Sequence, residues 1–155
     1  MATKDEKLKV LSELAAEFNR QDLTWAVGAS LLLYLKGYVH DFHDIDIMVA
    51  DTDAAKMETI LKAKGDIQPW EKGSYETKHF RKFLIDGVEI DMMGGLAIVK
   101  DGKVYDCDLK KNQITGNAEV DGQNIPLHSV KLWEKYYMLM GREEKAKIIE
   151  KNIHA

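Results

Sequence analysis

Residues 40–49 read HDFHDIDIMV and place two carboxylates, Asp44 and Asp46, in a run that otherwise has the character of a strand entering the core (residues 43–50). Aspartate is disfavoured in strand interiors, and burial of an unpaired carboxylate is costly. Because strand side chains alternate between two faces, both carboxylates share one face and the apolar residues share the other. We therefore expect the apolar face to pack against helices while the carboxylates emerge together, where their repulsion calls for a cation such as Mg²⁺ between them.

A third acid interrupts another apolar run, VEIDMM at residues 88–93, in which Asp91 has an apolar residue on each side. If this strand is a neighbour of residues 43–50, three carboxylates converge, as two-metal phosphoryl transfer requires. The alternative is a solvated acid on an edge strand. Two further Asp-x-Asp triplets are interpreted as a helix cap (residues 51–53) and as the solvent face of a hairpin strand (residues 106–108).

The segment VGAS joins a short apolar strand (residues 23–28) to a helix (residues 29–37). Amides at the start of a helix, a glycine that permits close approach and a hydroxyl together suit a phosphate group, so Gly28 and Ser30 are candidate phosphate ligands. The segment is neither a Walker A loop nor the G-x-G-x-x-G of a dinucleotide fold. An ordinary tight bend is the alternative.

The rest of the chain predicts an α+β protein. Helical spacing of apolar residues predicts a helix over residues 5–20, Gly37 is an expected C-cap, and Asp51 or Thr52 is expected to cap a helix ending at Gly65. Asp-Gly pairs between strand-like runs predict three hairpins, with turns at residues 86–87, 101–102 and 121–122. Two helices close the chain, over residues 129–141 and 142–153. These elements indicate a mixed or antiparallel sheet with helices packed against it.

Length and composition limit the possible functions. The 155 residues suit one domain spanning residues 1–155. A net charge of −4 and a pI near 5.7 argue against a nucleic-acid partner, which needs a basic stripe. The single cysteine, Cys107, allows no disulfide within the chain and suits a reducing compartment. No apolar run approaches the length of a membrane span and the first residues are not a signal peptide, so we expect a cytoplasmic protein without a membrane partner.

Taken together, WAVGAS, HDIDIMV and VEIDMM resemble the nucleotidyltransferase superfamily with the DNA polymerase beta-like fold. In length and layout, including the closing helix pair, the chain is similar to the small bacterial lincosamide and other antibiotic nucleotidyltransferases. Ala29 stands where the family has its second Gly or Ser, with Ser30 one place later, and the interval from Gly28 to Asp44 is slightly long. The resemblance implies a mixed sheet flanked by helices and transfer of a nucleoside monophosphate from a nucleoside triphosphate to an acceptor hydroxyl, with release of pyrophosphate.

The resemblance also implies roles for individual residues. Asp44 and Asp46 would hold two Mg²⁺ ions, and Asp91 would bind the catalytic ion and help to deprotonate the acceptor. ATP is the expected nucleotide. The candidate triphosphate contacts are the two positions of the glycine segment and two cations, each cation having simple solvation as its alternative: Gly28, Ser30, Lys36 and Arg81.

Two other functions fit parts of the sequence. The doublets His40-Asp41 and His43-Asp44 suit a metal-dependent phosphohydrolase, and the departures around Ala29 suit a non-catalytic nucleotide-binding or antitoxin-like module of the same fold. As acceptor we expect a small hydroxyl-bearing molecule, and a homodimer could complete its site. Three side chains of residues 69–83 either line the acceptor pocket or make ordinary cross-strand contacts: Trp70, Tyr75 and His79.

Overall fold

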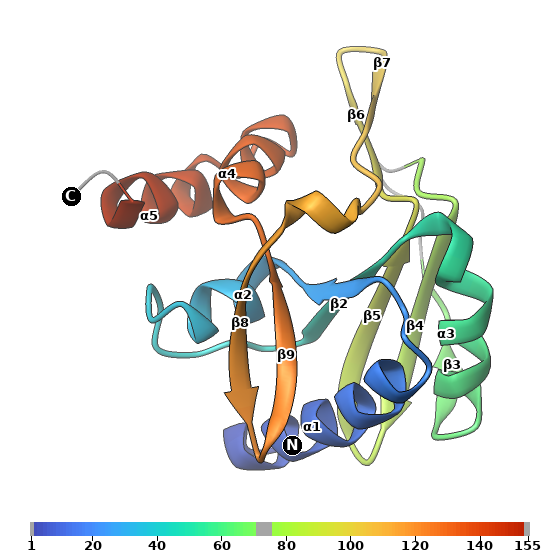
Figure 1. Ribbon diagram of the computed structural model, residues 1–155. Helices are drawn as coiled ribbons and strands as arrows, with labels where there is room; N and C mark the ends of the chain where they lie inside the picture. The colour runs from blue at the N-terminus through green and yellow to red at the C-terminus, as the bar shows by residue number, and fades with distance from the viewer. Residues whose placement is uncertain (1, 71–75, 154–155) are drawn as a thin grey trace.

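A mixed sheet of seven strands forms the centre of the computed structural model, which describes residues 2–70 and 76–153 (Figure 1). The strand order is β3-β4-β5-β2-β1-β9-β8, with β2 parallel to β5, β1 parallel to β9 and the other neighbours antiparallel. The bounds are β1 Trp25–Val27, β2 Ile45–Val49, β3 Asp66–Gln68, β4 His79–Ile85, β5 Val88–Gly94, β8 Ile114–Val120 and β9 Gln123–His128. A separate hairpin, β6 Ala97–Lys100 and β7 Lys103–Asp106, projects beyond the sheet.

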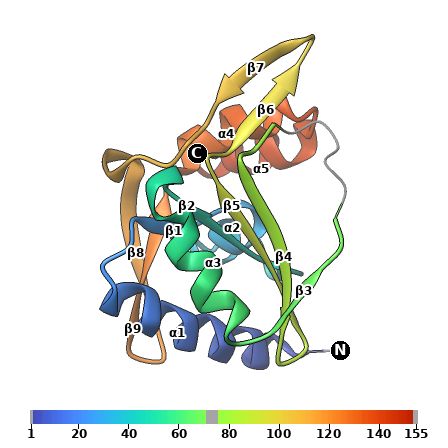
Figure 2. The same ribbon diagram turned by 90° about the vertical axis from the view of Figure 1, so that its right-hand side faces the viewer.

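Helices lie on both faces of this sheet (Figure 2). Helices α1 and α3 cover the face that carries the apolar side chains of β2, whereas α2 and α4 lie on the face that carries Asp46. The helix bounds are α1 Lys4–Arg20, α2 Ala29–Leu35, α3 Ala54–Lys62, α4 Val130–Leu139 and α5 Glu143–Ile153, with short 3-10 turns at η1 Asp51–Asp53 and η2 Lys111–Gln113. The predicted α+β architecture and the closing helix pair are confirmed. Within the described ranges, no helix combines the length and apolarity needed to cross a membrane.

The three hairpins form at the predicted Asp-Gly turns. The first pairs Ile85 with Val88, and its turn residues Asp86 (φ 49°) and Gly87 (φ 77°) both adopt the left-handed conformation that a type I′ turn requires. The other two turns close in the same way, pairing Lys100 with Lys103 and Val120 with Gln123. Because a two-residue turn fixes the register, the hairpin partners follow from the turn position by counting, except beyond a register shift between Ile114 and Gly116 in β8.

The predicted cap of α3 is wrong. The helix begins at Ala54 after the 3-10 turn, and no side chain caps it. Asp51 instead pairs with His79 across the sheet edge, with 2.7 Å between Oδ1 and Nε2, while the Asp53 carboxylate accepts a hydrogen bond from the Thr24 amide. Both carboxylates therefore interact with residues far away in the sequence and do not cap the helix.

Candidate active site

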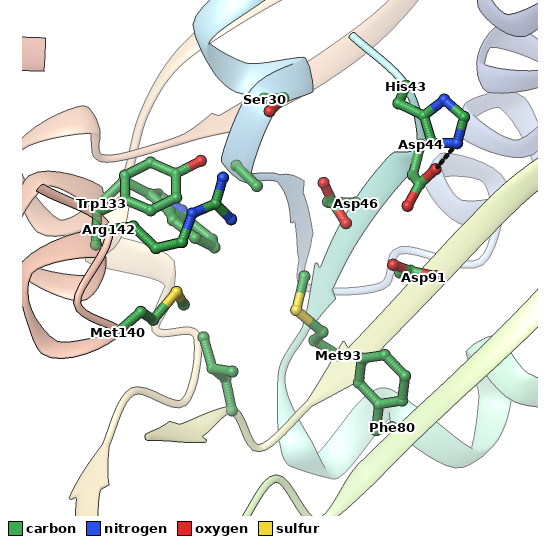
Figure 3. A pocket seen from close by; sticks show the side chains of 13 residues that line it. Ser30, His43, Asp44, Asp46, Phe80, Asp91, Met93, Trp133, Met140 and Arg142 are labelled. Carbon is green, nitrogen blue, oxygen red and sulfur yellow. Dashed lines mark ion pairs between the residues drawn. The ribbon is translucent and has the colours of Figure 1, made fainter. Parts of the chain in front are cut away.

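Neighbouring strands β2 and β5 bring the three predicted carboxylates together. The two strands are parallel, and their register sets Asp46 directly beside Asp91. Asp44 precedes β2 by one residue and lies on the same face. One oxygen from each of the three carboxylates lies within 4.8 Å of the others (Figure 3). The three acids thus cluster as the alternation of side chains predicts. Their chemical roles remain predictions.

Apolar packing on the opposite face of the sheet holds the two strands that carry these carboxylates in place. Ile45 and Ile47 of β2 and Ile90 of β5 are completely buried between the sheet and helices α1 and α3. Each fully buried aliphatic side chain contributes about 1.5–3 kcal/mol. The packing offsets the cost of carrying Asp46 and the nearly buried Asp91 in strand interiors.

Burial and mutual repulsion disturb the ionisation of the cluster. Burial, a hydrogen bond with Glu89 and the charge of Asp91 raise the pKa of Asp44 to about 6. Burial, with the charges of Asp91 and Asp44, raises the pKa of Asp46 well above its usual range. Oδ1 of Asp44 is buried without a hydrogen bond and has only an ion-pair contact with Nε2 of His43 at 3.3 Å. The environment of the cluster therefore favours the protonated forms of Asp44 and Asp46.

These shifts predict a pH-dependent stability without metal. A carboxyl whose pKa is raised from 3.8 to about 6 on folding leaves the native state holding more protons than the unfolded state between these values. Stability should therefore fall as pH rises through this window, and the penalty should be complete above about pH 6. We expect the melting temperature of metal-free Asp44→Asn, measured from pH 4 to pH 8, to rise relative to that of the parent as the pH increases. Parallel curves would contradict this assignment.

A cavity of about 330 Å³ opens from the carboxylates toward α2 and α4. Ser30 lies at its α2 edge and Arg142 projects into it from the turn between α4 and α5, as Figure 3 shows. Much of the remaining lining is aromatic or sulfur-containing: Phe80, Met93, Trp133, Tyr137 and Met140. An apolar wall beside convergent polar groups is typical of small-molecule sites.

Close packing accounts for the glycine of the VGAS segment. A Cβ built on Gly28 would lie 2.5 Å from Cζ2 of the buried Trp133, so the indole ring fills the space that a side chain would need. The Gly28 amide is already used, because it donates to the carbonyl of Asp46 at 3.0 Å. Gly28 therefore shapes the wall of the site. The polar side chain of the segment is that of Ser30, whose hydroxyl accepts a hydrogen bond from Lys145 at 3.4 Å.

The next residue, Ala29, has a left-handed backbone (φ 51°) that costs a residue with a Cβ about 1–2 kcal/mol. We expect Ala29→Gly to raise the free energy of unfolding by up to about 1 kcal/mol, after allowance for the greater entropy of an unfolded glycine. Gly28→Ala should instead lower it by about 1–3 kcal/mol, because Trp133 must move. Urea denaturation of both variants is the measurement. No gain in Ala29→Gly would contradict the strain at Ala29, and no loss in Gly28→Ala would contradict the role of the Trp133 contact.

The cations that reach the site differ from those expected. Nζ of Lys82 lies 2.9 Å from Oδ1 of Asp91. Although burial alone would lower the pKa of Lys82, the hydrogen bond and the charges of Asp91 and its acidic neighbours outweigh burial and raise it. The sequence did hold a signal for Lys82, because counting back from the Asp86-Gly87 turn places it opposite Asp91. Arg142 carries no local signal, since only the packing of the C-terminal helices brings it near.

The structure does not bring Lys36 or Arg81 to the cavity. Arg81 lies next to Lys82 in β4 and so points to the other face, where its Nε lies 2.7 Å from Oε1 of Glu58 in α3. Lys36 follows the C-terminal end of α2, at the opposite end of the helix from Ser30, and is exposed. Simple solvation, the alternative for each cation, fits the exposed Lys36, whereas Arg81 forms an ion pair with Glu58.

The expected acceptor pocket is only partly supported. The ring of Trp70 packs against that of Phe80, with 5.0 Å between centroids, and Phe80 lines the cavity. His79 shares the face of Arg81 and pairs with Asp51, so it points away from the cavity. Tyr75 lies outside the described residues.

Comparisons with known proteins relate the chain to nucleotidyltransferases. A sequence model of the family described as aminoglycoside-2''-adenylyltransferase matches residues 10–152. A proposed nucleotidyltransferase from Thermotoga maritima is 26% identical, with a TM-score of 0.75 over 99% of this chain and 96% of that one. The antibiotic-resistance factor ANT(2'')-Ia in complex with adenylyl-2''-tobramycin is 12% identical, with a TM-score of 0.63 over 94% and 88% of the two chains.

A lincosamide antibiotic adenylyltransferase, LnuA with lincomycin bound, is 15% identical, with a TM-score of 0.57 over 92% of this chain and 95% of that one. At such identities, the likeness to ANT(2'')-Ia and LnuA shows a common fold. A sequence search of curated proteins finds no match. The predicted resemblance to the nucleotidyltransferases is confirmed.

Proposed function

The chain belongs to the aminoglycoside-2''-adenylyltransferase family and is a nucleotidyltransferase, and from its site we propose that it transfers a nucleoside monophosphate to a hydroxyl of a small antibiotic-like acceptor. ATP is the proposed donor. The observation that carries the proposal is the convergence of Asp44, Asp46 and Asp91 on one edge of a cavity. Relatives of the same fold, named for aminoglycoside and lincosamide substrates, support the acceptor class.

The donor set of the cluster fits Mg²⁺. Three carboxylates offer the hard oxygen ligands that this ion prefers, and Oδ1 of Asp44 is buried without a hydrogen bond, so it is available as a ligand. Asp44, Asp46 and Asp91 would hold the metal, with two ions as the resemblance implies. When bound, Mg²⁺ would supply charge neutralisation and polarisation of the phosphoryl oxygens.

We assign the triphosphate to the side of the cavity near α2. The Ser30 hydroxyl and the Lys145 ammonium are already in contact there, and the Arg142 guanidinium projects toward the carboxylates. Phosphoryl transfer needs mainly positioning and neutralisation of charge, which two cations and a hydroxyl provide. Arg142 and Lys145 thus replace Lys36 and Arg81 as the proposed phosphate cations.

The linear arrangement of the site suits an in-line displacement. In Figure 3, Asp46 lies between Arg142 on one side and Asp91 on the other. The acceptor hydroxyl would approach from the Asp91 side and lose its proton to that carboxylate as its oxygen bonds to the α-phosphorus. The bond from the α-phosphorus to the bridging oxygen breaks, and pyrophosphate leaves toward Ser30 and Arg142.

Pyrophosphate release tests this proposal. Each nucleoside triphosphate should be incubated with Mg²⁺ and a panel of aminoglycosides, lincosamides and tRNA, with Asp46→Asn as the inactive control. We expect release that requires both ATP and a small hydroxyl-bearing acceptor. Phosphate release without an acceptor would favour the phosphohydrolase, and binding of nucleotide without turnover would favour the non-catalytic module. The homodimer remains a prediction that sedimentation can test.

A further inference from the structure

One lysine contacts the carboxylate cluster from the neighbouring strand. Lys82 in β4 stands opposite Asp91 in β5, and its ammonium lies 2.9 Å from Oδ1 of that nearly buried carboxylate. Among the described residues, this is the one ion pair between the three aspartates and a lysine or arginine; the other partner, His43, pairs with Asp44. Within the described part of the chain, Lys82 is therefore the permanent counter-charge in direct contact with an acid of the cluster, whereas Arg142 faces the acids from across the cavity.

That counter-charge and a divalent cation compete for the same carboxylate. Two positive charges a few ångströms apart repel strongly near a protein surface, where effective dielectric constants are low. The Lys82 ammonium and a divalent cation therefore each lower the affinity of Asp91 for the other. The side chain of Lys82 remains about one-third exposed, which leaves the ammonium a route into water when it gives up Asp91.

We propose that Lys82 is the internal counter-ion of the metal site, which neutralises Asp91 in the metal-free protein and is displaced when the divalent ion binds. The inference rests on the proposed function, because it takes Mg²⁺ as the ion that the cluster holds. Lys82 acts here as a positioning residue: it keeps Asp91 turned toward the other acids and sets the metal concentration at which the site fills.

A purely structural salt bridge would behave differently. Removal of an ordinary cross-strand pair lowers stability slightly and leaves metal affinity unchanged. The pair between Lys78 and Asp51, with 3.1 Å between Nζ and Oδ2, lies away from the cluster and offers a matched control. Lys82→Met keeps the aliphatic stem and removes the charge, whereas Lys82→Arg keeps the charge.

The test is a titration of each full-length variant with MgCl₂ alone, without nucleotide, followed by thermal unfolding and calorimetry. We expect Lys82→Met to have a lower metal-free melting temperature than the parent and a Mg²⁺ midpoint lowered by about fivefold or more, because a repelling charge has gone. Lys82→Arg should keep the parental midpoint. Lys78→Met should keep it too, despite a small loss of stability.

Each other outcome has a definite meaning. A parent that responds to Mg²⁺ while Lys82→Met has an unchanged or higher midpoint overturns the inference and leaves the proposed function standing. A parent indifferent to Mg²⁺ overturns the metal part of the proposed function and the inference with it. If Lys82→Met fails to fold, Lys82→Gln carries the same comparison.

Discussion

Asp46→Asn is expected to lower turnover by about 10²–10³-fold or more and to weaken Mg²⁺-dependent nucleotide binding at the same time. Asp46 lies at the centre of the cluster, beside Asp91 on the next strand and within reach of Asp44. Since the triphosphate would be held partly through the metal, loss of a metal ligand removes affinity as well as rate. Asp44→Asn should act in the same direction.

The same change should raise the metal-free melting temperature. Burial and the charges of Asp91 and Asp44 make an ionised Asp46 unfavourable, and an amide of the same shape removes that penalty. A rise in stability together with a loss of activity separates this expectation from simple misfolding, which would lower both. Mg²⁺ should in turn stabilise the parent by mass action and leave Asp46→Asn nearly unaffected.

Calorimetric binding of a non-hydrolysable ATP analogue, with and without Mg²⁺, is the deciding measurement. Asp106→Asn is a suitable control, because Asp106 belongs to another Asp-x-Asp triplet and is exposed at the end of β7. It should bind and react like the parent. If Asp46→Asn also behaves like the parent, the carboxylates of β2 are structural and the proposed function fails.

Local rules predicted much of this site. Alternation along the strand placed Asp44 and Asp46 on one face, and the Asp-Gly turns determined the hairpin register to the residue. The same counting places Lys82 opposite Asp91, so this partner is predictable from the sequence, whereas the predicted phosphate cation is its neighbour Arg81. A shift of one residue along a strand reverses the face, which is why Arg81 pairs with α3 instead.

Long-range packing accounts for what local rules missed. Strands β2 and β5 are separated in sequence by α3, β3 and β4. No local pattern predicts that the two strands pair, so from the sequence their pairing could only be assumed. Strand β3 has three residues, of which one is apolar, so it is too short to give a periodic signal. Arg142 reaches the cavity only because α4 packs Trp133 against Gly28 and thereby places the following turn. Such contacts depend on the whole fold.

Asp91→Asn should separate binding from chemistry. If Asp91 serves chiefly to take the proton of the acceptor hydroxyl, the variant should bind the ATP analogue nearly as the parent does and turn over about 10²–10⁴-fold more slowly, the usual contribution of a positioned general base. Asp44 and Asp46 would still hold the metal. Removal of the carboxylate leaves the Lys82 ammonium without its partner, but this side chain can reach water, so the stability cost should be at most about 1 kcal/mol.

The comparison with Asp46→Asn decides the role of Asp91. Both variants lose one charge from the same cluster, and both occupy directly paired positions on β2 and β5, so a difference in nucleotide affinity reflects a difference in function. If Asp91→Asn loses affinity as severely as Asp46→Asn, Asp91 is mainly a metal ligand and the base lies elsewhere. If instead Asp91→Asn keeps its nucleotide affinity while its turnover falls, Asp91 acts on the acceptor side of an in-line transfer. That role explains why a third acid lies in an apolar strand, paired with Lys82.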